Sequence, residues 1–529
     1  MEISKKSLLF LILTFTLSST LTQGANILFF LGVSTYSHRI LVWPLAEKLV
    51  ELGHDVTFVS SYQPKNPNPN ITEFVSKSLQ ELIDAKFGDK ADLIELRELG
   101  EHTKIWDDVE ELGVTMCEVL MKDPEYISLI KSKRYDLVVI DFLDNECALG
   151  IVRYHKAKFI IFDTNHPAMW QHDSFGMPAE TSWVPDLPTA YPHDMGFLHR
   201  FANTFWPLRW YFNRVYFMYP KMEAAINEGF GWVGDERISL REMELDTSLV
   251  LMNSHFSVDY ARSLPPLYIP VCGLHIKPAT NQLPKDIQKF ADESGDSGFI
   301  YVSFGSAVQF SKAKPQLRDA FFKAFENSPV RFIWKWEGPR PKEMPSNVLT
   351  ASWMPQADVL AHPKIKAFIT HAGLLGTSEA IVHAVPLIAF PCFAEQDYNS
   401  DRMEHVGYGI RMEFVGLKQQ DLHNAIVQIL TNPRYKENML EIQKRFTDRQ
   451  NDPLDTAVWW TEYVLRNKKS RLMMPLGRYQ YWFVRRSLDI WGSIIGIICI
   501  FLGIIMGYIL CRSRTNGAVS QPDPSKKNR

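Results

Sequence analysis

Short apolar runs alternate with helix-length segments along most of the chain. Three short runs are mostly apolar and bounded by turn residues: Asn26–Leu31, Tyr135–Asp141 and Phe159–Phe162. Runs of this kind are typical of parallel strands buried on both faces. After the first of them comes the loop Gly32–Arg39, then a helix to about Leu52 and a second strand from His54. The pattern predicts an α/β fold with a doubly wound parallel sheet over residues 25–275.

A second alternating region begins at Phe299. Its runs Ala367–Thr370 and Pro386–Phe390 read as buried strands separated by a helix. Leu264–Pro284, between the two regions, is rich in proline and suits a linker. After about residue 440 the pattern becomes helical and charged. We therefore expect a second α/β domain over residues 276–440 and closing helices over 441–489, with a cleft between the two domains.

The two ends of the chain set the compartment. Residues 1–24 combine Lys5 and Lys6 with the apolar run Leu8–Leu17, which is the pattern of a signal peptide cleaved after Gly24. The alternative is an uncleaved anchor, for which this run is short. Residues 490–511 carry no charge and as a helix would rise roughly 33 Å, enough to cross a bilayer. We expect a single-pass type I protein with a lumenal body and a cytosolic tail, residues 512–529.

The last four residues, Lys526 to Arg529, place lysines fourth and third from the end. That position resembles the dilysine retrieval signal of endoplasmic-reticulum membrane proteins, and the alternative is a merely solvated basic end. The sequon Asn70-Ile-Thr72 lies in a stretch rich in proline and asparagine. A lumenal body would make Asn70 a glycan acceptor.

Composition narrows the function classes. The chain has 529 residues, of which 46% are hydrophobic and 22% charged, so it is globular, and its net charge of −3 argues against a nucleic-acid binder. No Cys/His cluster with metal-ligand spacing occurs, so no metal site is expected. The six cysteines show no paired spacing, and we expect the lumenal ones to be mostly buried thiols. They stand at positions 117, 147, 272, 392, 499 and 511.

Residues 353–396 carry the most specific chemistry. Polar residues follow the two strands of this block at their carboxyl ends, where open α/β sheets bind ligands. His371-Ala372-Gly373 leads into a helix, whose first N–H groups favour an anion such as phosphate. Trp353 offers a flat face to a nucleobase, Gln356 a donor and acceptor for the base edge, and Glu379 an acceptor for ribose hydroxyls. The block predicts a nucleotide-sugar site.

This block resembles the signature of the UDP-glycosyltransferase family, in particular its membrane-bound animal branch, the UDP-glucuronosyltransferases. Gly298–Val308 resembles the first strand and phosphate-contacting turn of the donor domain, and Gly273–Ala279 the segment joining the two domains. Matching motifs run from about Asn26 to the C-terminal anchor. The resemblance implies the GT-B architecture, in which an N-terminal acceptor-binding domain faces a C-terminal UDP-sugar-binding domain, both Rossmann-like, followed by helices that return to the N-terminal domain.

The resemblance also implies residue roles. His38, in a loop after the first strand, would be the general base, and Asp141 would hold its tautomer. His371, Gly373, the helix start behind them and the Gly305-Ser306 turn would receive the diphosphate. Glu395 and Gln396 would bind the sugar hydroxyls. The sequence contains no Asp-x-Asp, so the expected reaction is metal-independent and inverting, with UDP-glucuronate or UDP-glucose as co-substrate and no other cofactor.

Three departures from the family pattern bear on this expectation. Ala372 replaces the first glycine of a Gly-Gly pair, Leu375 replaces an asparagine, and Glu395 replaces the aspartate usual in vertebrate glucuronosyltransferases. They leave glucuronic acid and glucose open as the donor sugar. The implied acceptors are small lipophilic molecules with hydroxyl, carboxyl or amine groups, conjugated for clearance. The alternative function is a catalytically weak UDP-sugar-binding membrane partner that modulates related transferases.

Three further segments have two interpretations each. Leu198–Lys221 interleaves aromatic residues with arginines, which suits a core helix near the acceptor pocket or a helix that touches a membrane. The aromatic residues around Trp170–Trp183 line an apolar pocket or belong to the core. Small residues on one face of the span favour a homo- or hetero-oligomer through that helix, unless their spacing is chance. These residues are Gly492, Gly496, Gly503 and Gly507.

Overall fold

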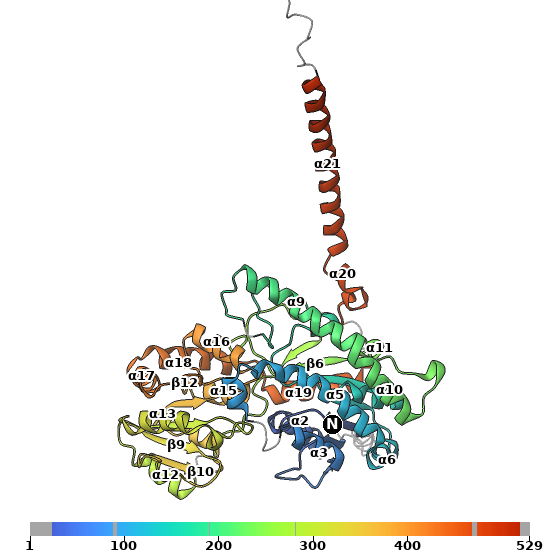
Figure 1. Cartoon of the computed structure of the whole chain (residues 1–529). Coiled ribbons are helices and arrows are strands. Elements are labelled where there is room, and N and C mark those ends of the chain that lie inside the picture. Colours follow the sequence, from blue (N-terminus) through green and yellow to red (C-terminus); the bar gives the residue numbers. More distant parts are fainter. Residues whose placement is uncertain (1–23, 88–91, 190, 281, 468–472, 519–529) are drawn as a thin grey trace, which may run out of the picture. The chain divides into compact units, whose positions relative to one another are not determined.

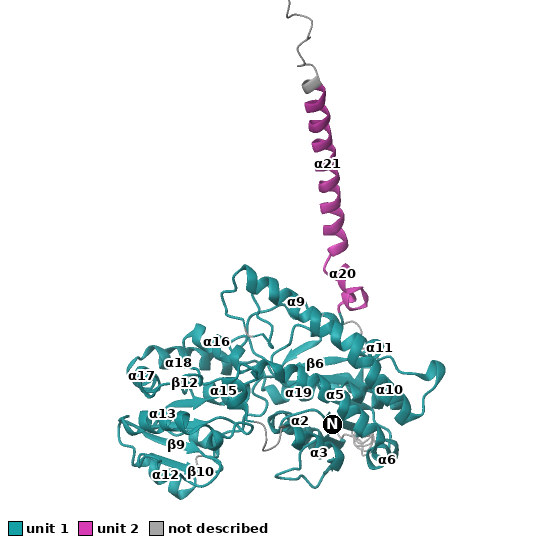
Figure 2. Cartoon of the chain, in the orientation of Figure 1, with its two compact units in different colours: residues 1–474 teal, residues 475–529 magenta. Residues whose placement is uncertain are grey.

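The computed structural model describes residues 24–87, 92–189, 191–280, 282–467 and 473–518. It divides into two compact units, Met1–Met474 and Pro475–Arg529 (Figure 2). The expected signal peptide and the dilysine motif lie outside the described residues, apart from Gly24.

The first unit contains two open sheets, and all their strand pairings are parallel. The first sheet has the order β3-β2-β1-β4-β5-β6-β7, and the second has the order β10-β9-β8-β11-β12-β13. The strands of the first are β1 (Asn26–Leu31), β2 (Asp55–Ser60), β3 (Ile71–Phe74), β4 (Leu137–Asp141), β5 (Lys158–Asp163), β6 (Leu249–Met252) and β7 (Tyr268–Pro270). Those of the second are β8 (Phe299–Ser303), β9 (Arg331–Lys335), β10 (Val348–Ala351), β11 (Ile365–Thr370), β12 (Leu387–Ala389) and β13 (Gly409–Arg411).

Helices connect the strands and cover the sheets (Figure 1). Those in the first domain are α2 (Tyr36–Glu51), α3 (Lys77–Phe87), α4 (Leu93–Glu98), α5 (Ile105–Lys122), α6 (Pro124–Ser132), α7 (Leu149–His155), α8 (Gln171–Phe175), α9 (Phe197–Asn213), α10 (Tyr219–Phe230) and α11 (Leu240–Glu244). Those that follow are α12 (Lys285–Asp292), α13 (Pro315–Glu326), α14 (Gln356–Leu360), α15 (Leu374–Val382), α16 (Gln396–Val406), α17 (Gln419–Thr431), α18 (Arg434–Thr447) and α19 (Pro453–Arg466).

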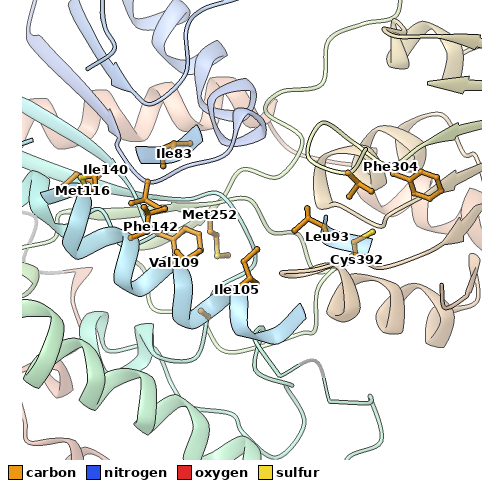
Figure 3. Close-up of a cluster of buried hydrophobic side chains, with 14 of the residues drawn as sticks. Ile83, Leu93, Ile105, Val109, Met116, Ile140, Phe142, Met252, Phe304 and Cys392 are labelled. Carbon is orange, nitrogen blue, oxygen red and sulfur yellow. The ribbon is translucent and has the colours of Figure 1, made fainter. Parts of the chain in front are cut away.

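The two sheets share a continuous apolar core. One cluster of buried side chains includes Ile140 and Phe142 of the first domain together with Phe304 and Cys392 of the second. Figure 3 shows Leu93 of α4 beside Cys392, so α4 lies where the two domains meet. The last helix of the unit, α19, packs back on the first domain, where Lys158 Nζ donates to the backbone oxygen of Leu465 at 2.9 Å.

The expected α/β fold with two parallel sheets is confirmed, and most strands lie within a residue or two of their expected positions. Two expectations need correction. The proline-rich segment 264–284 is not only a linker, because it contains β7, which pairs with β6 at the edge of the first sheet. Proline is tolerated there because an edge strand has no ladder partner on one side.

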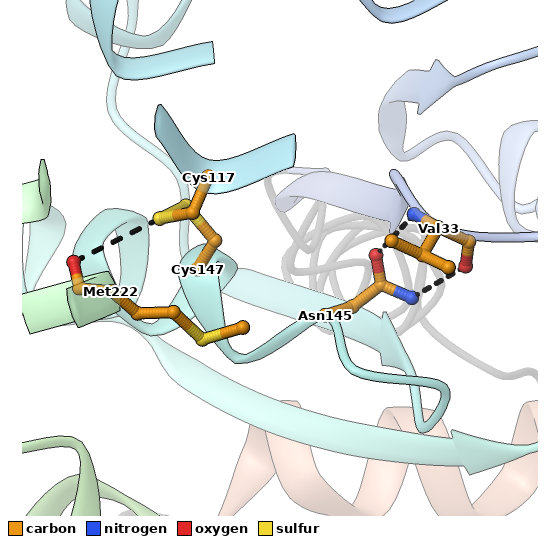
Figure 4. The surroundings of a disulfide bond; sticks show 5 residues. All are labelled: Val33, Cys117, Asn145, Cys147 and Met222. Carbon is orange, nitrogen blue, oxygen red and sulfur yellow. Dashed lines mark hydrogen bonds between the residues drawn. A yellow bond between two sulfur atoms is a disulfide. The ribbon is translucent and has the colours of Figure 1, made fainter. Parts of the chain in front are cut away.

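The expectation that the lumenal cysteines are mostly buried thiols is wrong for two of the four. Cys117 of α5 and Cys147 form a disulfide (Figure 4), whereas Cys272 and Cys392 are buried free thiols. No sequence spacing signals this pair, because the fold rather than the local sequence brings α5 next to the loop after β4.

The second unit consists of α20 (Trp482–Arg485), the 3₁₀ turn Leu476–Tyr479 and α21 (Leu488–Ala518). Within residues 488–515, an 18-residue stretch reaches a mean hydropathy of 2.8, so this helix is long and apolar enough to cross a membrane. The glycines at 492, 496, 503 and 507 have open space where a side chain would stand.

Candidate active site

The first group of site residues lies at the carboxyl ends of neighbouring strands. His38 is in the first turn of α2, directly after β1, and Asp141 is the last residue of β4, which pairs with β1. The His38 Nδ1 atom lies 2.6 Å from Asp141 Oδ2, and both side chains are buried. An ionised Asp141 accepts the Nδ1–H bond, which fixes the tautomer whose Nε2 lone pair can take a proton.

Thr164 extends this pair and was missed by the sequence analysis. It follows β5, the next strand of the sheet, and its hydroxyl lies 3.1 Å from Asp141 Oδ1 and 3.0 Å from His38 Nδ1. The hydroxyl therefore donates to the carboxylate that orients His38. Its position just beyond the carboxyl end of a buried strand is the signal in the sequence that could have identified it.

Opposing effects set the pKa of His38. Burial lowers it, but the charge of Asp141, the hydrogen bond to Asp141 and a smaller contribution from Glu395 raise it above the ordinary 6.5. A pKa shifted upward is expected for an imidazole whose protonated form is stabilised by a carboxylate. A proton taken from an acceptor would be stabilised on His38 in the same way.

The segments that follow β1 and β4, next to His38 and Asp141, are hydrogen-bonded to each other (Figure 4). Asn145 follows Asp141 in the chain. Its Nδ2 donates to the backbone oxygen of Val33 at 2.8 Å, and its Oδ1 accepts from the Val33 N–H at 2.7 Å. Two residues later, Cys147 is bonded to Cys117 of α5. These bonds hold the segment after β1 and the segment after β4 at a fixed separation, which in turn limits the distance between His38 and Asp141.

The second group surrounds His371, after β11. A Cβ atom added at Gly305 would lie 2.7 Å from the imidazole, and one at Gly373 would lie 2.6 Å from its Nε2. Both positions therefore need glycine, so that the backbone can pack against the ring. Burial, followed by the charge of Lys335, lowers the pKa of His371 to about 4, so the ring is neutral near pH 7. Its Nδ1 is buried with no hydrogen-bond partner among the described residues.

Lys335 is a second residue that the sequence analysis missed. It ends β9, beside β8, and its Nζ donates to the Gly305 backbone oxygen at 2.8 Å and to Glu337 at 2.9 Å. A cation, a neutral imidazole and the exposed Ser306 thus border one turn.

Ala372 has a φ of +63°, in the region that favours glycine, and it is buried. The departure from the glycine pair is therefore accommodated with backbone strain.

The third group lies on the segment after β10, which leads into α14, and on α15, which follows β11. Gln356 Nε2 donates to Glu379, and its Oε1 accepts from the Tyr301 hydroxyl at 3.3 Å. Burial raises the pKa of Glu379. The Trp353 indole is 65% exposed, so its ring face is open to a planar ligand. Together these residues offer a ring face, an amide and a carboxylate within one short stretch of the second domain.

Glu395 and Gln396 lie at the start of α16. Glu395 Oε1 is 3.4 Å from the backbone nitrogen of Leu374, the first residue of α15, and burial raises its pKa. The amide oxygen of Gln396 accepts from the backbone N–H groups of Cys392 and Phe393 at 2.9 and 3.2 Å. Gln396 therefore also shapes the loop after β12. Asp397, next along, accepts from Arg97 of α4 at 2.9 Å.

Two further predicted features are Asn70 and the aromatic segment Trp170–Trp183. Asn70 is exposed beside β3. Trp170 is buried and Trp183 is half exposed, and Trp170, Phe142 and Phe175 line a cavity of about 10 Å³ beside Asp141. That is room for roughly one water molecule. Among the described residues, no group of three or more His, Cys, Asp or Glu side chains is arranged to hold a metal ion.

The chain is similar to known proteins over most of its length. Residues 33–519 match the family model described as "UDP-glucoronosyl and UDP-glucosyl transferase". It is 32% identical to UDP-glucosyltransferase 2 of Dactylopius coccus, covering 94% of this chain and 95% of that protein. It is 27% identical to UDP-glucuronosyltransferase 1A8 of Homo sapiens, covering 87% of each.

Solved structures share the fold at low sequence identity. The calicheamicin glycosyltransferase CalG4 superposes with a TM-score of 0.57 at 17% identity, covering 84% of this chain and 100% of that one. A UDP-glucosyltransferase from Polygonum tinctorium superposes with a TM-score of 0.57 at 15% identity, covering 84% and 99%. Both likenesses bear on the fold alone.

Proposed function

The chain belongs to the family of UDP-glucuronosyl and UDP-glucosyl transferases, and on that premise we propose that it transfers glucose, in preference to glucuronic acid, from a UDP-sugar to small lipophilic acceptors. The observation that carries the proposal is the His38–Asp141 pair, with Nδ1 and Oδ2 2.6 Å apart at the carboxyl end of the first sheet. Glu395 of the second domain is close enough to influence the pKa of His38.

In the proposed reaction, His38 Nε2 removes the proton of an acceptor hydroxyl, carboxyl or amine group. The acceptor atom then forms a bond to the anomeric carbon, and the bond from that carbon to the diphosphate oxygen breaks. UDP leaves with the electron pair, and attack from the opposite face inverts an α-linked donor to a β-glycoside. Asp141 stabilises the imidazolium that results.

The diphosphate leaving group would lie against the Gly305-Ser306 turn, His371 and Gly373. A neutral His371 can donate one hydrogen bond without a metal, and the helix start after Gly373 adds backbone N–H groups. Lys335 supplies a positive charge at the same turn. Uracil would stack on Trp353 and meet Gln356, and Glu379 would accept from the ribose.

The preference for glucose rests on charge. Glucuronate would add a carboxylate next to Glu395. Burial already disfavours the ionised form of Glu395 and raises its pKa. The guanidinium groups of Arg97 and Arg411 are engaged by Asp397, the residue after Gln396. The relative at 32% identity is named a glucosyltransferase, whereas the human relative named a glucuronosyltransferase is at 27%.

We place the protein in the endoplasmic-reticulum membrane, with the catalytic body in the lumen and α21 as its span. The apolar α21, the lysines at 526 and 527 and the apolar run near the N-terminus support this location. Glycan attachment at Asn70 reports the topology. Asn70→Gln should abolish a glycosidase-sensitive mass increment, and a protein without any such increment would contradict a glycosylated lumenal body.

The function is tested by a donor screen. Membranes from cells that express the full chain are given UDP-glucose or UDP-glucuronate at equal concentration, with a panel of simple phenols. We expect faster transfer from UDP-glucose, and a rate lower by roughly 10²–10⁴-fold in His38→Ala with UDP affinity unchanged. Transfer from UDP-glucuronate alone would overturn the donor assignment, and a normal rate in His38→Ala would overturn the role of His38.

A second candidate function is a non-catalytic partner of related transferases. Ala372 at φ +63° and Leu375 motivate it, because Leu375 packs into the core around α2 instead of offering a polar side chain. Measurable UDP binding with no turnover across both donors and the whole acceptor panel would favour this candidate over transfer.

A further inference from the structure

One helix of the first unit carries a large apolar surface that the fold leaves uncovered. On α9, the side chains of Phe197, Leu198, Phe201 and Phe205 are between 54% and 77% exposed. The ring centroids of Phe201 and Phe205 are 4.7 Å apart, so they form one continuous patch. The following turn, Arg214–Met218, adds Tyr216 and Phe217, which are 63% and 65% exposed. Exposed apolar patches of this extent mark interaction surfaces.

The opposite face of α9 fixes this orientation. Asn203 is fully buried, its Nδ2 donates to the backbone oxygens of Thr181 and Val184 at 2.8 and 2.7 Å, and its Oδ1 accepts from the Asp186 N–H at 2.7 Å. Just beyond the helix, Arg214 pairs with Asp144 and lies 4.1 Å above the Trp170 ring. Rotation of α9 to bury its phenylalanines would break all of these contacts, so the contacts hold the aromatic face outward.

The charge of the segment selects a partner. Residues 197–221 contain four arginines and lysines and no aspartate or glutamate. Of the four basic residues, Arg214 points inward, while Arg200, Arg209 and Lys221 are exposed. Arg209 lies over the rings of Trp206 and Trp210 at 5.4 and 4.3 Å, and it also pairs with Asp107. A helix with an apolar aromatic face bordered by basic residues has the composition of an interfacial membrane helix.

The chain itself supplies a reason for a lipid surface to be near. Its α21 is long and apolar enough to cross a bilayer. A body tethered to a membrane in this way meets lipid at a high effective concentration, so that even a weak interfacial contact is populated. We propose that the aromatic face of α9, formed by Phe197, Leu198, Phe201 and Phe205, lies in the headgroup region of the bilayer that anchors the chain.

The test uses the full chain reconstituted in vesicles of phosphatidylcholine and phosphatidylserine. An environment-sensitive fluorophore is attached at Phe201→Cys, in a background with Cys499→Ser and Cys511→Ser. The matched control is Leu440→Cys on α18, which is also exposed at 45%. Lipids with a nitroxide near the headgroup should quench the probe at 201 several-fold more than the probe at 440. Equal quenching at both sites would overturn the proposal.

Two further arms keep the result unambiguous. Phe205→Cys carries the same probe one turn along α9 and should behave like Phe201→Cys; transfer activity of each labelled variant reports that it is folded. The other possible occupant is a second copy of this chain. Self-association would shift the emission of the probe at 201 without nitroxide quenching, and the shift would disappear when the protein is diluted to one copy per vesicle. That result would refute the lipid contact.

Discussion

The His38 imidazole titrates above its ordinary pKa because Asp141 stabilises its charged form. The base is the neutral form, whose fraction grows as pH rises. The rate at saturating donor and acceptor should therefore increase with pH through a pKa above 6.5, and it should fall at lower pH. Asp141→Asn removes the main influence that raises this pKa, so the acid limb should move to lower pH while the maximal rate falls. If the rate falls at the same low pH in both proteins, Asp141 does not set the pKa of the base.

Trp353 gives a second prediction at the residue scale. Its indole is 65% exposed, and stacking of a base on an aromatic ring contributes about 1–3 kcal/mol. Trp353→Ala should raise the donor KM roughly fivefold to 150-fold with little change in kcat. Trp459→Ala, on α19 and 52% exposed, is the matched control and should leave the donor KM unchanged. An unchanged KM in Trp353→Ala would show that the uracil lies elsewhere.

At the scale of elements, the disulfide joins α5 to the loop that follows β4. Its two cysteines are 30 residues apart in sequence, and a cross-link over a loop of this length stabilises a fold by about 3 kcal/mol. The double variant Cys117→Ser, Cys147→Ser should melt at a lower temperature than the natural chain in detergent. A reductant should lower the melting temperature of the natural chain to the same value and leave the variant unchanged. Insensitivity of both proteins to reductant would contradict the bond.

At the scale of the whole molecule, Arg97 of α4 links the two domains. Its guanidinium donates to Asp397 at 2.9 Å and to Glu413 at 2.6 Å, and Arg97 is buried. Asp397 directly follows Gln396, so Arg97→Ala should raise the donor KM. The variant should also lower thermal stability, because it leaves the buried Asp397 carboxylate partly unpaired. Lys314→Ala is the control, since it breaks the exposed pair between Lys314 and Glu98 of the same helix. Exposed pairs contribute little, so its effect should be small. Equal effects of the two variants would argue against a special role for Arg97.

Much of the molecule was determined by the sequence read on its own. The run Asn26–Leu31 matches β1 residue for residue, because a strand buried on both faces must be apolar at nearly every position. Polar residues placed just after such strands, including Asp141 and His371, could be assigned to the site since the carboxyl ends of parallel strands meet at one edge. The apolar α21 likewise follows from length and composition alone.

Only the tertiary structure decided which distant residues meet. The hydroxyl of Thr164, the Cys117–Cys147 bond, Lys335 at the Gly305 turn and the Arg97–Asp397 pair join segments that no local pattern relates. It also decided which face of α9 is outward, because the aromatic residues of that segment occur on both sides of the helix and only the contacts of Asn203 and Arg214 distinguish them. Periodicity reports whether a residue can be buried, whereas packing of the whole chain selects its partners.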